Sequence, residues 1–243
     1  MKEKRYYFDG KLDIGVSISL EGDEFHHMSN VMRAREGDKV CLINGDGNFY
    51  FSTISKLNKK SAEIKVENKA VSSCEPNINL TIFQALAKGD KLSLITQKVS
   101  ELGANKLCLF ESKFTDVKSN SHKAERLDTI AISASKQCGR ASILKIEGIL
   151  SIKDIVLKIH NYDAFFVAYE NEDGHTLVNS LLKLDKTCKN IAIMIGAEGG
   201  FDENEINSLR EGGADIVSLG NRILRTETAS IASTAQIFGI LDK

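Results

Sequence analysis

Residues 191–206, "IAIMIGAEGGFDENEI", combine a run of aliphatic residues, three glycines and a group of acidic residues. The aliphatic run at 191–195 is typical of a strand that is buried on both faces, as in a parallel sheet. Three glycines then break the strand: Gly196, Gly199 and Gly200. A polar helix is predicted to begin near Asp202, with Glu205 completing a capping box.

This glycine loop has two interpretations. It is either a tight corner between a strand and a helix, or a place where backbone N–H groups are exposed to hold a ligand. Its spacing matches neither the dinucleotide-binding fingerprint nor the phosphate-binding P-loop. The segment alone leaves both interpretations open.

A second segment, "DIVSLGNRILRTETASIASTAQIFGI" at residues 215–240, repeats the strand, loop and helix pattern. Gly220 ends the strand, and Thr226 is predicted to cap a helix rich in small residues. We expect two adjacent strands to end in glycine loops at the carboxyl edge of one sheet, where ligands bind in open α/β folds. The helix is expected to pack closely against its own sheet or another subunit.

The rest of the chain predicts two domains. Strands and helices alternate after Pro76, which indicates a parallel sheet flanked by helices. The predicted strands are 79–86, 105–111 and 163–170, and the predicted helices are 89–104 and 125–139. Residues 1–72 have shorter, strand-like segments and a hairpin centred on 44–47, so we expect a small β-barrel-like domain there and an α/β domain at 73–243.

Composition excludes several classes of protein. The 243 residues include 42% hydrophobic and 27% charged residues, as in an ordinary globular protein. The 32 basic and 33 acidic residues lack the basic excess of many nucleic-acid-binding proteins, although a local basic patch stays possible. Five scattered cysteines without a C-x-x-C pair argue against zinc or a disulfide framework and predict a cytoplasmic protein without metal. No signal peptide or membrane segment is expected.

Several segments of the chain resemble those of a known family. "IGAEGGFDENEI" followed by "SLGNRILRTETA" is similar to the small-subunit ribosomal RNA uridine-N3 methyltransferases, the RsmE type of the SPOUT superfamily. "FHHMSNVMRAREGDKVCLINGDG" resembles the PUA-like RNA-binding barrel of that family, and "KGDKLSLITQKVSELGANKLCLF" and "ASKQCGR" resemble its two middle motifs. The family usually has proline where Ala197 and Leu144 stand, a departure that affects only loop stiffness.

The resemblance implies a SPOUT-type α/β domain with a deep trefoil knot, preceded by a PUA-like β-barrel domain. It implies S-adenosyl-L-methionine as the methyl donor and a homodimer with the knot at its interface. The residues implied to bind this cofactor are Ala168, Tyr169, Gly196, Ala197, Glu198, Gly199, Gly200, Leu219, Gly220, Asn221, Ile223, Leu224 and Arg225.

Methyl transfer to uracil N3 requires alignment of donor and acceptor and removal of the N3 proton. Arg225 and Arg222 are candidates for stabilising the uracil anion or binding a phosphate. Glu198 and Glu227 are candidates for the base or for orienting these arginines. The plainer alternative is that Arg225 pairs with Glu227 and only braces the loop.

The implied substrate is small-subunit ribosomal RNA within the assembled 30S subunit. Candidate RNA-binding residues are Arg5, Arg33, Arg35, Lys59, Lys60 and Arg140, each of which could instead be a solvated charge. Three other readings stay open: a non-catalytic RNA-binding or ribosome-assembly protein of the same fold, a SPOUT methyltransferase for another base, and an α/β enzyme for a different nucleotide.

Overall fold

A computed structural model describes residues 4–115 and 121–242. The chain divides into two compact units. The first comprises residues 1–75 together with 135–143, and the second comprises residues 76–134 and 144–243. Residues 135–143, which fall inside the expected C-terminal domain, therefore group with the N-terminal segment.

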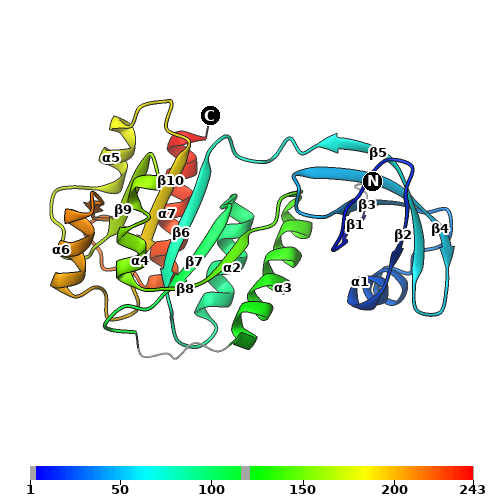
Figure 1. The fold of residues 1–243 in the computed structure, drawn as a ribbon, viewed down its shortest axis with the longest axis horizontal. Coiled ribbons are helices and arrows are strands. Elements are labelled where there is room, and N and C mark those ends of the chain that lie inside the picture. The colour runs from blue at the N-terminus through cyan, green and yellow to red at the C-terminus, as the bar shows by residue number, and fades with distance from the viewer. Residues whose placement is uncertain (1–3, 116–120, 243) are drawn as a thin grey trace. The chain divides into compact units, whose positions relative to one another are not determined.

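The first unit is built on a five-stranded mixed sheet (Figure 1). Its strands are β1 (Lys4–Tyr7), β2 (Ser17–Leu20), β3 (Lys39–Ile43), β4 (Asn48–Leu57) and β5 (Ala62–Val71), in the order β1-β3-β4-β5-β2. The predicted hairpin is confirmed: β3 and β4 pair antiparallel, and Gly45 and Gly47 between them have φ of +87° and +84°. A short helix, α1 (Gly22–His26), and one π-helical turn (His27–Val31) lie between β2 and β3. The core of the unit includes Tyr6, Leu42 and Ile64.

The second unit contains a six-stranded sheet in which every pairing is parallel, as the alternation of strands and helices predicts. Its strands are β6 (Asn79–Ala85), β7 (Lys106–Phe110), β8 (Lys145–Leu150), β9 (Ala164–Ala168), β10 (Asn190–Ile195) and β11 (Asp215–Val217), in the order β11-β9-β10-β6-β7-β8. The chain thus places β10 between β9 and β6, at the centre of the sheet. Strands β6 and β10 are almost entirely buried, in keeping with their unbroken apolar sequences.

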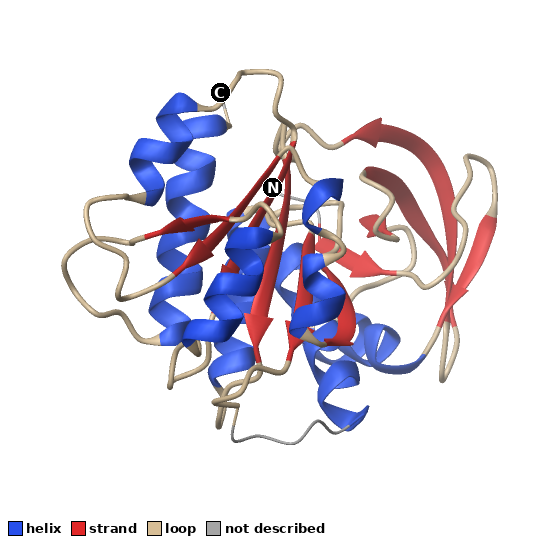
Figure 2. Cartoon of the chain, turned by 60° about the vertical axis from the view of Figure 1, so that its left-hand side comes forward, coloured by secondary structure: helices blue, strands red, loops and turns tan. Residues whose placement is uncertain are grey.

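Helices cover both faces of this sheet (Figure 2). The helices are α2 (Lys91–Leu102), α3 (Ser121–Cys138), α4 (Ile152–Val156), a 3-10 turn (Ile159–Asn161), α5 (Leu177–Lys183), α6 (Glu203–Glu211) and α7 (Thr226–Leu241). On one face α2 and α5 pack against α7, which contacts β10. On the other face Ile155 of α4 and Leu209 of α6 join a core with Phe83 and Met194. Gly103 ends α2 in the left-handed conformation (φ 114°), as predicted.

Two predictions about the sheet are corrected. The strands that carry the two glycine loops, β10 and β11, are not adjacent, because β9 pairs with both of them. The loops still meet, because all three strands end at the same edge. The sequence reasoning also missed β8, an edge strand whose residues are half-buried or exposed and so lack a continuous apolar run. Within the described ranges, no helix is both long and apolar enough to span a membrane.

Candidate functional site

A pocket of about 700 Å³ opens at the carboxyl edge of the parallel sheet. The loops that follow β9, β10 and β11 line it, together with the starts of α2 and α7. It therefore brings together the two glycine loops singled out in the sequence. Twelve of the thirteen residues expected to bind the cofactor line the pocket: Ala168, Tyr169, Gly196, Ala197, Glu198, Gly200, Leu219, Gly220, Asn221, Ile223, Leu224 and Arg225.

The glycine loop after β10 is a tight turn that is anchored at both ends. The N–H of Gly200 donates to the carbonyl of Ala197 (3.0 Å), and Gly200 has a φ of +69°. A Cβ at Gly200 would lie 2.2 Å from Oε1 of Glu170, so the missing side chain leaves room for that carboxylate. Phe201 is buried and stacks on Phe110, with 6.1 Å between ring centroids. The predicted capping box of α6, Asp202 with Glu205, is confirmed.

Gly199 is the thirteenth residue expected to bind the cofactor, and it lies outside the pocket. A Cβ at Gly199 would lie 2.8 Å from Cβ of Phe114, so this glycine allows the loop to pack closely against the segment after β7. The lack of a side chain at Gly199 therefore serves packing. The spacing of glycines in the sequence could not distinguish this role from a role in binding.

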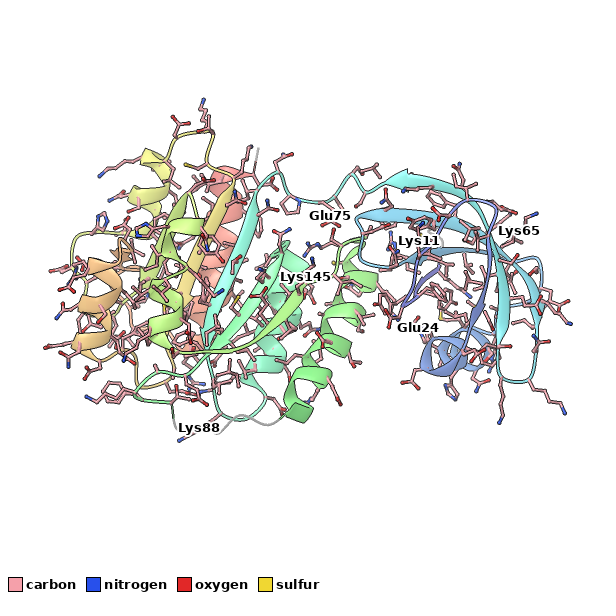
Figure 3. All side chains as sticks on the ribbon, viewed as in Figure 1. Lys11, Glu24, Lys65, Glu75, Lys88 and Lys145 are labelled. Atoms are coloured by element: carbon pink, nitrogen blue, oxygen red, sulfur yellow. The ribbon has the colours of Figure 1, made fainter. Side chains whose placement is uncertain are left out.

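Glu198 is tied to the segment that follows β6. Its Oε1 accepts from Nζ of Lys91 (2.6 Å) and from the N–H of Lys88 (3.2 Å), a residue labelled in Figure 3. Burial opposes ionisation of Glu198, but these hydrogen bonds and the charge of Lys91 outweigh it and hold its pKa below the usual range. Glu198 is therefore an ionised, paired carboxylate at neutral pH and a weak base.

Lys91 itself lines the pocket and was not predicted as a site residue. It begins α2, after the short loop of residues 86–90 that follows β6. The signal for it was available in the sequence, because "KGDK" follows a third buried strand whose end meets the same sheet edge.

Arg222 and Arg225 lie in the loop between β11 and α7, where both are exposed and line the pocket. Within the described residues neither guanidinium has a hydrogen bond or an ion pair, and none links Arg225 to Glu227. Glu227 lies outside the pocket lining, in the first turn of α7, and its Oε2 is buried without a hydrogen-bonding partner in the described structure. The two arginines are thus available to a ligand, whereas Glu227 is not.

Thr226 does not cap α7 as predicted. The N-cap position is Arg225, and no side chain caps the helix there. Thr226 is the first helical residue and is buried, and its Oγ1 donates to the carbonyl of Gly196 (2.6 Å). The hydroxyl therefore links the start of α7 to the glycine loop of β10.

The loop after β9 supplies acidic residues to the pocket that sequence reasoning did not single out. Glu170, Glu172 and Asp173 all line it. Glu172 is 3.6 Å from Arg210, whereas the carboxylate of Glu170 lies over Gly200. The acidic run "YENED" at the end of a buried strand was the available signal.

The first unit carries four of the six candidate RNA-binding side chains on its surface. Arg33, Arg35, Lys59 and Lys60 are exposed. Arg33 has a φ of +49° and is the only non-glycine residue of the described ranges with positive φ. The turn that holds Arg35 is fixed by its own N–H, which donates to Oδ2 of Asp38 (2.8 Å).

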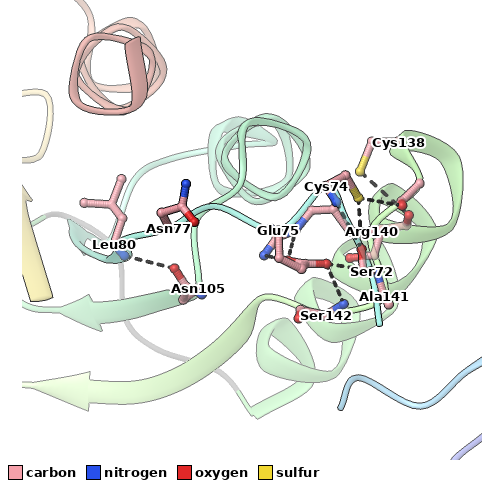
Figure 4. Close-up of polar contacts among 12 residues, drawn as sticks. Ser72, Cys74, Glu75, Asn77, Leu80, Asn105, Cys138, Arg140, Ala141 and Ser142 are labelled. Carbon is pink, nitrogen blue, oxygen red and sulfur yellow. Dashed lines mark hydrogen bonds and ion pairs between the residues drawn. The ribbon is translucent and has the colours of Figure 1, made fainter. Parts of the chain in front are cut away.

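The structure contradicts the assignment of Arg140 to RNA binding, because its side chain is only 4% exposed. Its Nε lies 3.0 Å from Oε2 of Glu75, and Oε1 of the same carboxylate accepts from the N–H groups of Ala141 and Ser142 (2.9 Å each) (Figure 4). We call this group the Glu75–Arg140 clamp. It is occupied within the first unit and is not presented to RNA.

Arg5 likewise has a structural role. Its Nη1 donates to the carbonyl of Lys136 (3.3 Å) near the end of α3, and its guanidinium lies 5.4 Å from the ring centroid of Phe49. Lys136 also forms an ion pair with Glu24 of α1. These contacts hold the end of α3 to the N-terminal segment within the first unit.

Comparisons with known proteins agree with this geometry. Residues 74–238 match the RNA methyltransferase domain family, and residues 20–67 match the RNA methyltransferase PUA domain family. The chain is 30% identical to ribosomal RNA small subunit methyltransferase E of Bacillus subtilis, over 96% of this chain and 95% of that protein. It is 29% identical to the protein of the same name from Rickettsia conorii, over 98% and 96%.

One solved structure adds a ligand to the comparison. A ribosomal RNA small subunit methyltransferase E from Neisseria gonorrhoeae, bound to S-adenosyl methionine, superposes with a TM-score of 0.89 at 27% identity over 98% of this chain and 97% of that chain. Among the described residues of the present chain, no three His, Cys, Asp or Glu side chains form a group that could hold a metal ion.

Proposed function

The chain belongs to the family of ribosomal RNA small subunit methyltransferases E, and we propose that it transfers a methyl group from S-adenosyl-L-methionine to N3 of a uridine in 16S ribosomal RNA. The observation that carries this proposal is the pocket at the carboxyl edge of the sheet. It combines backbone from two glycine loops with two arginines that have no protein partner in the described structure.

The residues present fit such a donor. A volume of about 700 Å³ is within the range of small-molecule sites, roughly 300–1,000 Å³. The missing Cβ of Gly200 leaves room for the carboxylate of Glu170 at the wall of the pocket. Glu170 offers a carboxylate to the hydroxyl or ammonium donors of a nucleoside amino acid. When bound, S-adenosylmethionine supplies a methyl group activated by a positively charged sulfur.

Residues of this chain can also be assigned to the uracil that accepts the methyl group. Uracil N3 must lose its proton before or during transfer, so negative charge develops on the ring and its oxygens. We assign Arg225 and Arg222, which line the pocket, to stabilising that charge or binding the neighbouring phosphate. Because the pKa of Glu198 is lowered by its contacts with Lys91 and Lys88, we assign Glu198 to holding the loop and not to proton removal.

We assign RNA binding to residues 1–72 and catalysis to residues 73–243. The match of residues 20–67 to the RNA methyltransferase PUA domain and the exposed cations Arg33, Arg35, Lys59 and Lys60 support the first assignment. N3 is on the Watson–Crick edge of the base, so the target uridine must be unpaired or flipped out when it reacts. We propose the assembled 30S subunit as the substrate and the cytoplasm as the location.

We also propose that the C-terminal segment is threaded as a trefoil knot and that the enzyme is a homodimer. Both ends of α7 form hydrogen bonds with residues that come much earlier in the sequence and lie next to strands β10 and β6. Thr226 bonds Gly196 at the end of β10, and Asp242 accepts from the N–H of Asn77, just before β6. These long-range contacts support the proposal, and tracing the chain in an electron-density map would test the threading.

Mapping of modified nucleosides in 16S ribosomal RNA tests the function directly. Cells that contain the protein should carry one N3-methyluridine that cells without it lack. Restoring the wild-type gene should restore the modification, whereas the Arg225→Ala variant should not. If the RNA from both kinds of cell is identical, the catalytic proposal is wrong and a non-catalytic RNA-binding protein becomes the better reading. A missing modification on a different base would correct only the acceptor atom.

A further inference from the structure

Gln84 is a buried amide side chain on a central strand of the parallel sheet. It belongs to β6, is completely buried, and faces α7, whereas its neighbours Phe83 and Ala85 join the core on the other face. Burying an amide is costly unless all of its hydrogen bonds are made. A leucine would fill this position more cheaply, so the amide needs an explanation.

The hydrogen bonds of Gln84 fix the orientation of its amide. Nε2 lies 2.9 Å from the carbonyl of Ala85, which can only accept, so this atom must be the amide nitrogen. Its second hydrogen points to Oγ1 of Thr226, at 3.0 Å. The amide oxygen accepts from the hydroxyl of Ser230, one turn further along α7.

This orientation in turn fixes the hydroxyl of Thr226. Because Oγ1 of Thr226 accepts from Gln84, its own proton is free to be donated, and it points to the carbonyl of Gly196 at 2.6 Å. Thr226 is only 4% exposed, so water does not compete for this bond. A relay of defined direction therefore runs from β6 through Gln84 and Thr226 to the first residue of the glycine loop.

We propose that Gln84 and Thr226 are positioning residues of the donor pocket, an inference that rests on the proposed function of that pocket. Gly196 and Ala197 both line it. The peptide bond between them is planar and trans, so the N–H of Ala197 points opposite to the Gly196 carbonyl. A carbonyl held by Thr226 consequently sets the direction of that N–H and the path of the loop through Gly200. Thr226 itself also lines the pocket, whereas Gln84 does not and can act on donor affinity only through Thr226 and the loop.

Thr226→Val tests the relay, because it removes the hydroxyl and keeps the side-chain shape. Thr234→Val is the matched control: Thr234 is also buried in α7, but its Oγ1 donates only to the carbonyl of Ser230 in its own helix (2.7 Å). Binding of S-adenosylmethionine is measured by calorimetry, and stability is measured by denaturant unfolding of the full chain. We expect both variants to lose similar stability, while only Thr226→Val loses donor affinity, by about tenfold or more. Thr226→Ser should restore the affinity.

Gln84→Glu provides a second variant of nearly the same shape. An ionised carboxyl has no donor and a protonated one has a single O–H, so neither form can donate to both Ala85 and Thr226, and we expect a loss of donor affinity similar to that of Thr226→Val. If wild-type protein binds the donor and both Thr226→Val and Gln84→Glu bind it equally well, the relay has no positioning role. Equal losses of affinity for Thr226→Val and Thr234→Val would also overturn the inference. Failure of the wild-type protein to bind would instead contradict the proposed function.

Discussion

Arg225 occupies the last position before α7, where the backbone is still extended (φ −66°, ψ 152°). Its neighbour Thr226 is bonded to Gly196, so the backbone of Arg225 is fixed while its exposed side chain lies at the pocket. Because the backbone is already fixed, only the rotamers of the side chain have to be ordered when the guanidinium meets a developing negative charge. Arg222, earlier in the same loop, lacks such an anchor beside it.

We therefore expect Arg225→Ala to lower the single-turnover rate of methylation about 10²–10³-fold at saturating donor and RNA. Arg225→Lys should also be impaired, because an ammonium group cannot reproduce the planar, forked donor geometry of a guanidinium. Donor affinity should change much less than the rate. A near-normal rate for Arg225→Ala would show that the residue only braces its loop.

The stability of the protein is expected to depend on pH through Glu198. Its pKa is lowered in the folded protein, so the ion pair with Lys91 stabilises the fold fully above the unfolded pKa of about 4.3 and progressively less as the pH falls through the lower, folded value. Wild-type protein should therefore unfold at higher denaturant concentration than Glu198→Gln at pH 7. This difference should shrink towards zero below about pH 4. A difference that stays constant with pH would exclude the ion pair as its source.

The sequence was enough to predict where the candidate pocket lies, but it was not enough to predict the partners of individual side chains. The two glycine loops and Arg222 and Arg225 could be singled out because they follow buried strands at the carboxyl edge of a parallel sheet and resemble the motifs of a known family. The structural role of Arg140 could not be recognised, because its partner, Glu75, lies 65 positions away in the sequence. Thr226 was misassigned for a similar reason: a threonine at the start of a helix normally caps it, and only the fold brings Gly196 within reach.

At the scale of elements, the Glu75–Arg140 clamp joins the end of α3 and the turn after it to the N-terminal segment within the first unit. Breaking a buried ion pair leaves one charge without compensation. Arg140→Ala should therefore lower the free energy of unfolding by about 3 kcal/mol, as measured by denaturant titration. RNA affinity measured on the fraction that stays folded should be unchanged.

The matched control for the clamp is a change of exposed arginines in the same unit. Charge reversal at Arg33 and Arg35 should leave the unfolding midpoint nearly unchanged and weaken RNA binding. The loss should be largest at low salt, since phosphate contacts act through release of counterions. If Arg140→Ala instead weakens RNA binding without a loss of stability, the clamp is not its main role.

Elements with a strong sequence pattern were predicted well, and those set by tertiary contacts were not. The apolar runs of β6, β7 and β10 and the periodicity of α2 identify them without further information. Strand order does not follow from such patterns, which is why β10 and β11 were expected to be adjacent although β9 separates them. Strand β8 was missed because an exposed edge strand needs neither alternation nor an apolar run.

At the scale of the whole molecule, α7 has one face that the single chain does not cover. Thr228, Ala235 and Gly239 are exposed along it, and Oε1 of Gln236 is buried without a hydrogen-bonding partner in the described structure. Small residues in this arrangement allow a second helix to approach closely. This face is the one we expect at the interface of the proposed homodimer.

Ala235→Arg should consequently convert the dimer to a monomer, because it places a long charged side chain in that interface. Ala70→Arg, at an exposed alanine of β5, is the control and should leave the dimer intact. Sedimentation velocity measures both. A wild-type protein that sediments as a monomer, or a dimer that Ala235→Arg does not disturb, would contradict the proposed interface.

Titration of the purified protein with S-adenosylmethionine tests the central claim, that the pocket at the carboxyl edge of the sheet holds the methyl donor. Gly200→Ala places a Cβ where the carboxylate of Glu170 now lies and so displaces that carboxylate from its place in the pocket, whereas Gly213→Ala also adds a Cβ at positive φ (+98° against +69°) but meets no described atom closer than 3.6 Å. We predict one binding site per chain, an affinity reduced about tenfold or more in Gly200→Ala, and unchanged affinity in Gly213→Ala. No binding by the wild-type protein, or equal affinities for all three, would contradict the account.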